Sequence, residues 1–488
     1  MGTRHKPFGL RMLLALIAFM LSGCIAPGAG GIQDSTGKSV IAFAHVNLVP
    51  MTSDVVQYDQ TVLIQGDRII GLGPSVEIPI PENATIIQGE GTFLMPGLAD
   101  MHIHTRQNWE SEVWPVSPLL LYLANGVTVI RDFGPEQSNP TYVLRWREEI
   151  EAGARIGPTI YASGKMLYAS PLGDPSEMVH ENFTLGFDFL KLYSYISRED
   201  FQQALTAAND LGMYSAGHVP YAVGLEMALA EGMNEIAHVE ELAFEFIEFD
   251  QDKQLSPEDW LAYLIGRAIQ QFDVSSGFIE DDFNRQHGST RDWILDQLDS
   301  AGVAVCTTMI IDDTIQLKLA QPHEFLERPE NRYLPERYLD LFRRGQERHQ
   351  RQLGGNQDLV AFKYGLDRWM LAGLHGAGIP LLLGTDSGTG TMGIVPGFSI
   401  HDELRILVEN GFSPYEAIAT GTVNASEVIE QMVGVGDFGT IEVGNRADLL
   451  LVARNPLEDV GAIRDLLGVM ASGRWYARQA LDQMLSLE

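Results

Sequence analysis

The sequence predicts an α/β fold in which eight strands alternate with helices, accompanied by a small β unit built from both chain ends. Three observations support this prediction. Short strand-like runs with turns come first, apolar runs alternate with helical stretches between residues 96 and 430, and β character returns near the C-terminus. A length of 488 residues suits one large barrel with a satellite domain.

Composition narrows the classes of function. The hydrophobic share of 45% is typical of a globular protein with a substantial core. The formal net charge of −32 argues against nucleic-acid binding, because such a surface repels the phosphate backbone.

The first 23 residues have the pattern of a lipoprotein signal peptide. Arg4, Lys6 and Arg11 form a cationic region at the start of a mostly apolar run at 10–21, which is too short for a comfortable membrane span. Leu21-Ser22-Gly23-Cys24 resembles the bacterial lipobox, in which Cys24 is lipidated; an ordinary signal peptide or a poor membrane anchor is the alternative. Ile25 after the cysteine predicts the outer membrane, with the protein facing the periplasm, and residues 24–38 are expected to be a tether.

The small β unit is expected to be a β-sandwich formed by residues 39–95 and 431–488. In the first part, runs at 40–46, 60–65 and 69–72 have strand character and are separated by Gly-Asp and Gly-Pro turns. In the second part, strands are predicted at 439–444, 447–452 and 469–476.

The central segment, 96–430, is predicted to be a (β/α)8 TIM barrel. After the strand that ends at His104, strands are expected at 126–131, 158–163, 189–193, 212–218, 235–238, 302–307 and 379–385. Helical stretches at 117–125, 198–211 and 222–231 lie between them, as βα units require. Two insertions, 244–299 and 310–377, follow strand ends and are expected to form helical lids over the active-site mouth.

Functional residues of such a barrel lie at the carboxyl ends of its strands. His102 and His104 end the first strand and share one face of it, because side chains i and i+2 of a strand point the same way. The ends of later strands add Lys191, His218, His238 and Asp386. Each of these residues alone could be an ordinary strand-end or turn residue. Together, their types and positions predict a metal site.

At this point the chain resembles the amidohydrolase superfamily, in particular its imidazolonepropionase-like and metal-dependent Xaa-dipeptidase (prolidase-like) branch. The resemblance extends from about residue 39 to residue 476. It is carried by the motifs at 95–104, 126–132, 381–388 and 439–449.

The resemblance implies two divalent metal ions, usually zinc. His102, His104 and Asp386 would bind the more buried ion, and His218 and His238 the more exposed one. Lys191 would bridge them as a carbamate formed with carbon dioxide, since an ammonium would repel two dications.

The resemblance also implies roles for residues around the metals. Asp386 would be the catalytic residue that moves the proton of the attacking water. Tyr193 shares the strand face of Lys191 and, as in related dipeptidases, would contact a substrate carboxylate. Arg131 could pair with the same group or only pack against its neighbour, and His401 could serve the pocket or cap a helix.

The preferred hypothesis is a metal-dependent hydrolase of amide or peptide bonds, most simply a dipeptidase or prolidase-like enzyme with a small-molecule substrate and a lipid anchor. One alternative is hydrolysis of cyclic amides, lactones or phosphotriesters by the same site. The other is a binding lipoprotein that has lost catalysis.

Overall fold

The computed structural model describes residues 39–107, 114–135 and 138–487. The predicted signal peptide, the tether and Cys24 lie outside these residues. Among the helices of the described ranges, none combines the length and the apolar character that crossing a membrane requires.

A run of parallel strands carries the candidate site. In chain order these strands are β6 (Leu98–Ile103), β7 (Val127–Asp132), β8 (Thr159–Ala162), β9 (Leu167–Ala169), β10 (Phe189–Tyr195), β11 (Tyr214–Gly217), β12 (Glu235–Ile236), β13 (Ala304–Cys306) and β14 (Leu381–Leu382). The strands β6, β7 and β8 pair in that order, and β9 to β14 form a second parallel sheet.

Isolated bridges link the two parallel sheets at both ends. Ser163, after β8, pairs with Phe189 of β10, and Ile103 of β6 pairs with Ser387, after β14. The second bridge therefore connects the last parallel strand to the first. Every residue of β6 and β7 is buried, as expected for parallel strands that are covered on both faces. The fold is therefore α/β and TIM-barrel-like.

Helices follow most of these strands. They are α1 (Pro118–Ala124), α2 (Tyr142–Glu151), α3 (Pro175–Leu185), α4 (Arg198–Leu211), α5 (Leu225–Ala230), α13 (Ser399–Glu409), α14 (Pro414–Thr420) and α15 (Val423–Val433). Local signals explain their ends. Ser197 caps the start of α4 through the amide of Asp200, and Gly212 ends it in the left-handed conformation.

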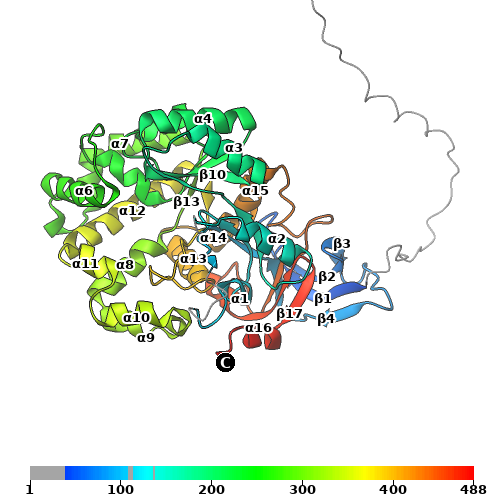
Figure 1. Cartoon of the computed structure of the whole chain (residues 1–488). Helices are drawn as coiled ribbons and strands as arrows, with labels where there is room; N and C mark the ends of the chain where they lie inside the picture. Colours follow the sequence, from blue (N-terminus) through cyan, green and yellow to red (C-terminus); the bar gives the residue numbers. More distant parts are fainter. Residues whose placement is uncertain (1–38, 108–113, 136–137, 488) are drawn as a thin grey trace, which may run out of the picture. The chain divides into compact units, whose positions relative to one another are not determined.

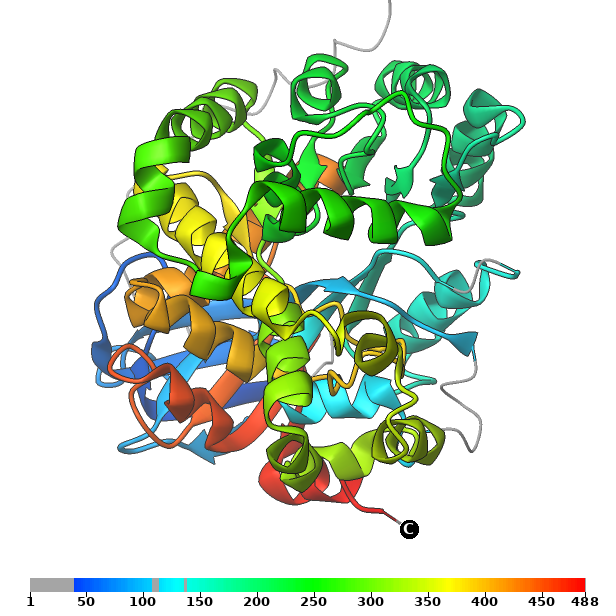
Figure 2. The same cartoon turned by 90° about the vertical axis from the view of Figure 1, so that its left-hand side faces the viewer.

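The two insertions are helical, as predicted. The first contains η2 (Val239–Phe246), α6 (Pro257–Gln271), η3 (Val274–Ser276) and α7 (Glu280–Ala301). The second contains α8 (Ile310–Ala320), α9 (Pro322–Glu327), η4 (Pro329–Tyr333), α10 (Glu336–Arg343), α11 (Arg348–Leu353) and α12 (Gln357–Ala377). Figure 2 shows these green-to-yellow helices on the side toward the viewer.

Strands from both chain ends join in one mixed sheet. Its strands are β1 (Val40–Leu48), β2 (Gln57–Gln65), β3 (Arg68–Pro74), β4 (Thr85–Gln88), β5 (Phe93–Pro96), β15 (Leu449–Val452), β16 (Leu466–Ala471) and β17 (Arg474–Ala477). The junction is β5, which pairs with β1 on one side and antiparallel with β15 on the other. Figure 1 accordingly shows the red strand β17 near the blue strands. The helix α16 (Arg478–Met484) follows.

One residue separates this mixed sheet from the parallel strands. The strand β5 ends at Pro96, and β6 begins at Leu98. A Cβ atom added to the intervening Gly97 would lie 2.2 Å from the hydroxyl oxygen of Thr128 in β7. The close approach of this residue to β7 therefore requires glycine. The Pro-Gly pair therefore sets the position of the strand that carries His102.

One predicted strand is wrong. Residues 439–444 form bends and a turn, with Gly439 and Gly444 at φ values of 83° and 101°. Such backbone cannot continue a strand, although the apolar residues between the glycines look strand-like. The run predicted at 469–476 is a hairpin, β16 and β17, that turns at Ser472 and Gly473.

Candidate metal centre

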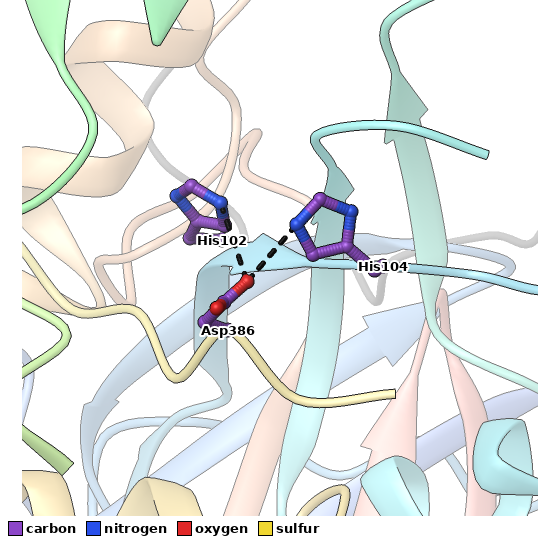
Figure 3. Close-up of side chains that lie close together, drawn as sticks. All are labelled: His102, His104 and Asp386. Carbon is purple, nitrogen blue, oxygen red and sulfur yellow. Dashed lines mark ion pairs between the residues drawn. The ribbon is translucent and has the colours of Figure 1, made fainter. Parts of the chain in front are cut away.

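Two imidazoles and one carboxylate meet where β6 and β14 end. His102 lies in β6, His104 follows it, and Asp386 belongs to the loop after β14. The Asp386 Oδ1 atom is 2.9 Å from His104 Nε2 and 3.6 Å from His102 Nε2. One ligand atom from each of the three residues lies within 4.8 Å of the others, a spacing that suits a single metal ion (Figure 3).

Backbone and carboxylate contacts fix Asp386 against β6. The Asp386 amide donates to the His102 carbonyl at 2.7 Å, and Asp386 has the positive φ of 54°. Asp100, buried in β6, accepts from the Thr385 amide at 3.0 Å and from its hydroxyl at 2.6 Å. An aspartate tolerates the left-handed region better than most residues, and the paired strands hold it there.

Two further histidines complete the cluster from β11 and β12. The His238 ring lies 4.5 Å from the His102 ring and 4.8 Å from the His218 ring, between ring centroids. His218 directly follows β11, and His238 lies two residues after β12. Four imidazoles from three strands thus gather at one edge of the parallel strands.

Three of these imidazoles have a hydrogen-bond partner at Nδ1. The partners are the Gly134 carbonyl for His104 at 3.3 Å, Glu241 for His218 at 2.6 Å and the Thr308 hydroxyl for His238 at 2.8 Å. A partner at Nδ1 orients the ring and leaves Nε2 for a metal, the arrangement common in metal sites.

Lys191 is buried on β10. Its side chain is 1% exposed, and no described residue hydrogen-bonds its Nζ atom. The amine lies 4.7 Å from the centroid of the Phe133 ring. Burial lowers the pKa of Lys191 to about 8, because an ammonium loses its hydration there.

The polar atoms of the cluster fit bound metal ions. Both ring nitrogens of His102 are buried and lack a hydrogen-bond partner among the described residues, as does Lys191 Nζ. Orphaned polar atoms of this kind are costly, and a metal ion or a carboxylated lysine would remove that cost.

The electrostatics favour the protonation states that metals require. Burial lowers the pKa of His102 and His218 well below the ordinary value, and lowers that of His238 to about 4. Burial opposes ionisation of Asp386, but neighbouring His104 brings its pKa to about 2. Neutral imidazoles and an ionised carboxylate are the ligand forms for divalent metals.

The three residues predicted to contact substrate lie in different surroundings. Tyr193 lies beside the cluster, with its ring centroid 4.3 Å from that of His218. Arg131 is fully buried, donates to the Met101 carbonyl at 2.8 Å and forms a two-pronged ion pair with Glu235. Its donors are engaged inside the protein, which favours the packing alternative for Arg131 over the substrate contact.

His401 is buried in the first turn of α13. Burial is the main cause that lowers the pKa of its imidazole to about 3, followed by the charge of Arg464. Neither ring nitrogen has a hydrogen-bond partner among the described residues. The predicted pocket role of His401 therefore stays a prediction, beside the alternative of a structural role in the helix.

Sequence reasoning missed the residues that orient the ligands. Glu241 follows His238 by three residues and reads in the sequence as an ordinary charge at the start of an insertion. Thr308 lies two residues after β13 with a φ of 46°, and the only signal in the sequence is a polar residue that follows an apolar run. Glu403 on α13 holds this turn, accepting from the Met309 amide at 3.0 Å and the Ile310 amide at 2.7 Å.

Comparisons with known proteins give a family match and similar folds. Residues 364–476 match the family described as "Amidohydrolase family". The chain is 34% identical over 103 residues to an adenine deaminase of Staphylothermus marinus, a match that covers 20% of this chain and 16% of that protein. The match thus spans only about a sixth of the length of this relative.

Solved structures resemble nearly the whole chain. A Xaa-Pro dipeptidase with bound methionine in its active site has a TM-score of 0.61 at 18% identity, covering 90% of this chain and all of the other. A bottromycin amidohydrolase has a TM-score of 0.63 at 20% identity, covering 92% and 89% of the two chains. The family match and these similar folds confirm the resemblance of this chain to the amidohydrolase superfamily.

Proposed function

We propose that this protein is a metal-dependent hydrolase of carbon–nitrogen bonds, with dipeptides or related amino-acid amides as substrates. The observation that carries the proposal is the convergence of four imidazoles, one carboxylate and a buried amine at the ends of parallel strands. The likeness to a Xaa-Pro dipeptidase and to an amidohydrolase supports this class of bond.

The proposed ligand sets are those the sequence indicates. His102, His104 and Asp386 would hold one divalent ion, and His218 and His238 a second, with zinc as the proposed metal. Lys191 would bridge them as a carbamate formed with carbon dioxide. Its depressed pKa supports this, because the neutral amine is the form that reacts with carbon dioxide.

Bound metals would supply Lewis acidity, lowering the pKa of a water molecule and polarising the substrate carbonyl. The protein's own contribution is proton transfer and orientation. The Asp386 carboxylate, ionised at neutral pH, accepts a proton from the attacking water and returns it to the departing nitrogen. Glu241 and Thr308 hold the imidazole rings of His218 and His238 in a fixed orientation through their Nδ1 atoms.

Several finer features belong to the same proposal. We interpret the linked parallel strands as a (β/α)8 barrel at 96–430, and the mixed sheet as the β-sandwich of the two chain ends. The N-terminal pattern supports a lipid anchor at Cys24 and a location on the outer membrane facing the periplasm. Growth with labelled palmitate, comparing wild type with Cys24→Ala, tests the anchor.

A hydrolysis screen tests the activity. The protein, loaded with zinc in bicarbonate buffer, is assayed against dipeptides, N-acyl amino acids, lactams, lactones and organophosphates, with metal content measured in parallel. We expect release of amines from the acyclic amides. Two zinc ions per chain with no amide cleaved, but turnover of lactones or phosphotriesters, would replace the proposed substrate class.

A further inference from the structure

Three tyrosines form a continuous aromatic surface beside the metal centre. We name Tyr168, Tyr193 and Tyr195 the tyrosine platform. The centroid of the Tyr168 ring lies 4.8 Å from that of Tyr193 and 5.4 Å from that of Tyr195, and the latter two are 5.6 Å apart. Because the Tyr193 ring also contacts His218 at 4.3 Å, the platform begins at a candidate metal ligand.

The strand alternation explains why these rings point the same way. Lys191, Tyr193 and Tyr195 occupy alternate positions of β10, so their side chains share one face. Lys191 is buried at the cluster, and the two tyrosines continue outward from it. Tyr168 comes from the neighbouring strand β9, which pairs in parallel with β10.

A second aromatic layer supports the platform from behind. The Tyr221 ring meets Tyr195 edge-on at 5.9 Å and contacts Trp260 of α6 at 5.2 Å. The Tyr221 amide donates to the Ser194 carbonyl at 3.0 Å, which ties this layer to β10. These contacts restrict the movement of Tyr195 in the platform.

The outer face of the platform remains available to a ligand. Tyr168 is 44% exposed although its ring packs against two others, at interplanar angles of 42° to Tyr193 and 74° to Tyr195. No described residue hydrogen-bonds the hydroxyl groups of the three tyrosines, and a phenol is uncharged at neutral pH. The platform thus offers neutral phenol rings with free donors.

Nearby charges do not select an ion for this surface. Burial has the largest effect on the pKa of Tyr168, followed by Glu258, which raises it, and Arg348, which lowers it. These two insertion residues carry opposite charges and oppose each other at the platform. These opposite charges leave no net charge at the platform that selects an ionic ligand, and its phenol rings can pack against the ring of a neutral aromatic group.

We propose that the tyrosine platform binds an aromatic side chain of the substrate, so that the preferred substrates are amides of aromatic amino acids. The inference rests on the proposed amide hydrolysis, because it places the ring next to the bond that the metal centre would cleave. Tyr168, half-exposed and at the outer end, is the specificity-determining residue. Its ring would stack on the substrate ring, and loss of such a pair weakens binding severalfold.

Matched substrates test the platform. The zinc-loaded full chain is assayed with Gly-Phe, Phe-Gly and N-acetyl-phenylalanine, each beside its cyclohexylalanine analogue, which has a similar size but no aromatic ring. Wild type should prefer one of the phenyl compounds over its analogue by about 3- to 10-fold in kcat/KM. In Tyr168→Ala the ratio should fall toward one through a higher KM, whereas Tyr168→Phe should keep it.

Tyr58→Ala is the matched control, because Tyr58 is 66% exposed on β2 of the mixed sheet. It should leave the ratio unchanged. Amide hydrolysis with equal rates for phenyl and cyclohexyl compounds, or a preference that survives Tyr168→Ala, overturns the inference and leaves the proposed function intact.

If no amide is cleaved, the proposed function fails. Calorimetric titration then tests separately whether the tyrosine platform binds an aromatic ring. The same protein is titrated with N-acetyl-phenylalanine and N-acetyl-cyclohexylalanine. Tighter binding of the phenyl compound that depends on Tyr168 supports the platform. Equal binding of the two compounds refutes it.

Discussion

Replacement of Glu241 by glutamine should weaken metal binding at His218 and His238 while the fold persists. The Glu241 carboxylate is buried and accepts from His218 Nδ1 at 2.6 Å and from the Val219 amide at 3.1 Å. A glutamine side chain has a single acceptor oxygen, so one of these donors would face an NH2 group. Burial raises the pKa of Glu241 to about 8, so above this pH the carboxylate is ionised and its replacement also removes a negative charge that increases the basicity of the imidazole toward a metal.

The size of the effect follows from the hydrogen bonds lost. A hydrogen bond to a charged group contributes about 1.5–3 kcal/mol. Since 1.4 kcal/mol corresponds to a factor of ten, the affinity for the metal at His218 and His238 should fall roughly 10- to 100-fold. Binding at His102, His104 and Asp386 should change much less.

Competition with a chelator during zinc titration measures both affinities. Glu245→Gln is the matched control, because Glu245 also lies in η2 but accepts from the Leu225 amide at 3.0 Å rather than from a histidine. Circular dichroism should show that both variants are folded. If Glu241→Gln binds two zinc ions as tightly as wild type, or if Glu245→Gln shows the same loss, the assigned orienting role is wrong.

Three further predictions concern other residues. Asp386→Asn should retain metal but lose about 10²- to 10⁴-fold in kcat, because the amide cannot carry the proton; unchanged kcat at full zinc occupancy would exclude that role. Burial raises the pKa of Glu403 to about 7 from an ordinary 4.5. Between these two pH values, Glu403 is protonated in the folded state and ionised in the unfolded chain. Stability should therefore fall by roughly 3 kcal/mol as pH rises from 4.5 to 7, and Glu403→Gln should flatten this part of the denaturant-midpoint profile; an identical profile would refute the assignment. Arg131→Met should lower the free energy of unfolding by about 3–5 kcal/mol because Glu235 stays buried and unpaired. The double variant Arg131→Met/Glu235→Met should recover most of this loss, and failure to recover would show that the ion pair is not the cause.

Much of the site could be predicted because its geometry follows from strand periodicity. Alternation places His102 and His104 on one face of β6, and parallel strands bring their carboxyl ends to one edge. The positions of Lys191, His218, His238 and Asp386 after apolar runs were therefore sufficient to predict a cluster. The comparisons confirm the superfamily resemblance that this pattern suggests.

The orienting contacts could not be predicted, because they join residues distant in the chain. His238 bonds to Thr308 across 70 positions, and Arg131 pairs with Glu235 across 104. In the sequence, Arg131 is a cation at the end of a predicted strand. This pattern does not distinguish a residue that contacts the substrate from one that packs inside the protein. Its fully buried pairing with Glu235 appears only once β7 and β12 lie in one fold.

The amino-acid sequence by itself determined the order of strands and helices and the types of residue at the strand ends. Local periodicity and turn chemistry encode these features within a few neighbouring residues. Only the tertiary structure decided which partners His104, His218 and His238 have at Nδ1, that Lys191 is buried with no hydrogen-bond partner among the described residues, and that Tyr168 packs beside Tyr193. These properties depend on burial and on contacts between distant segments, which local patterns do not specify.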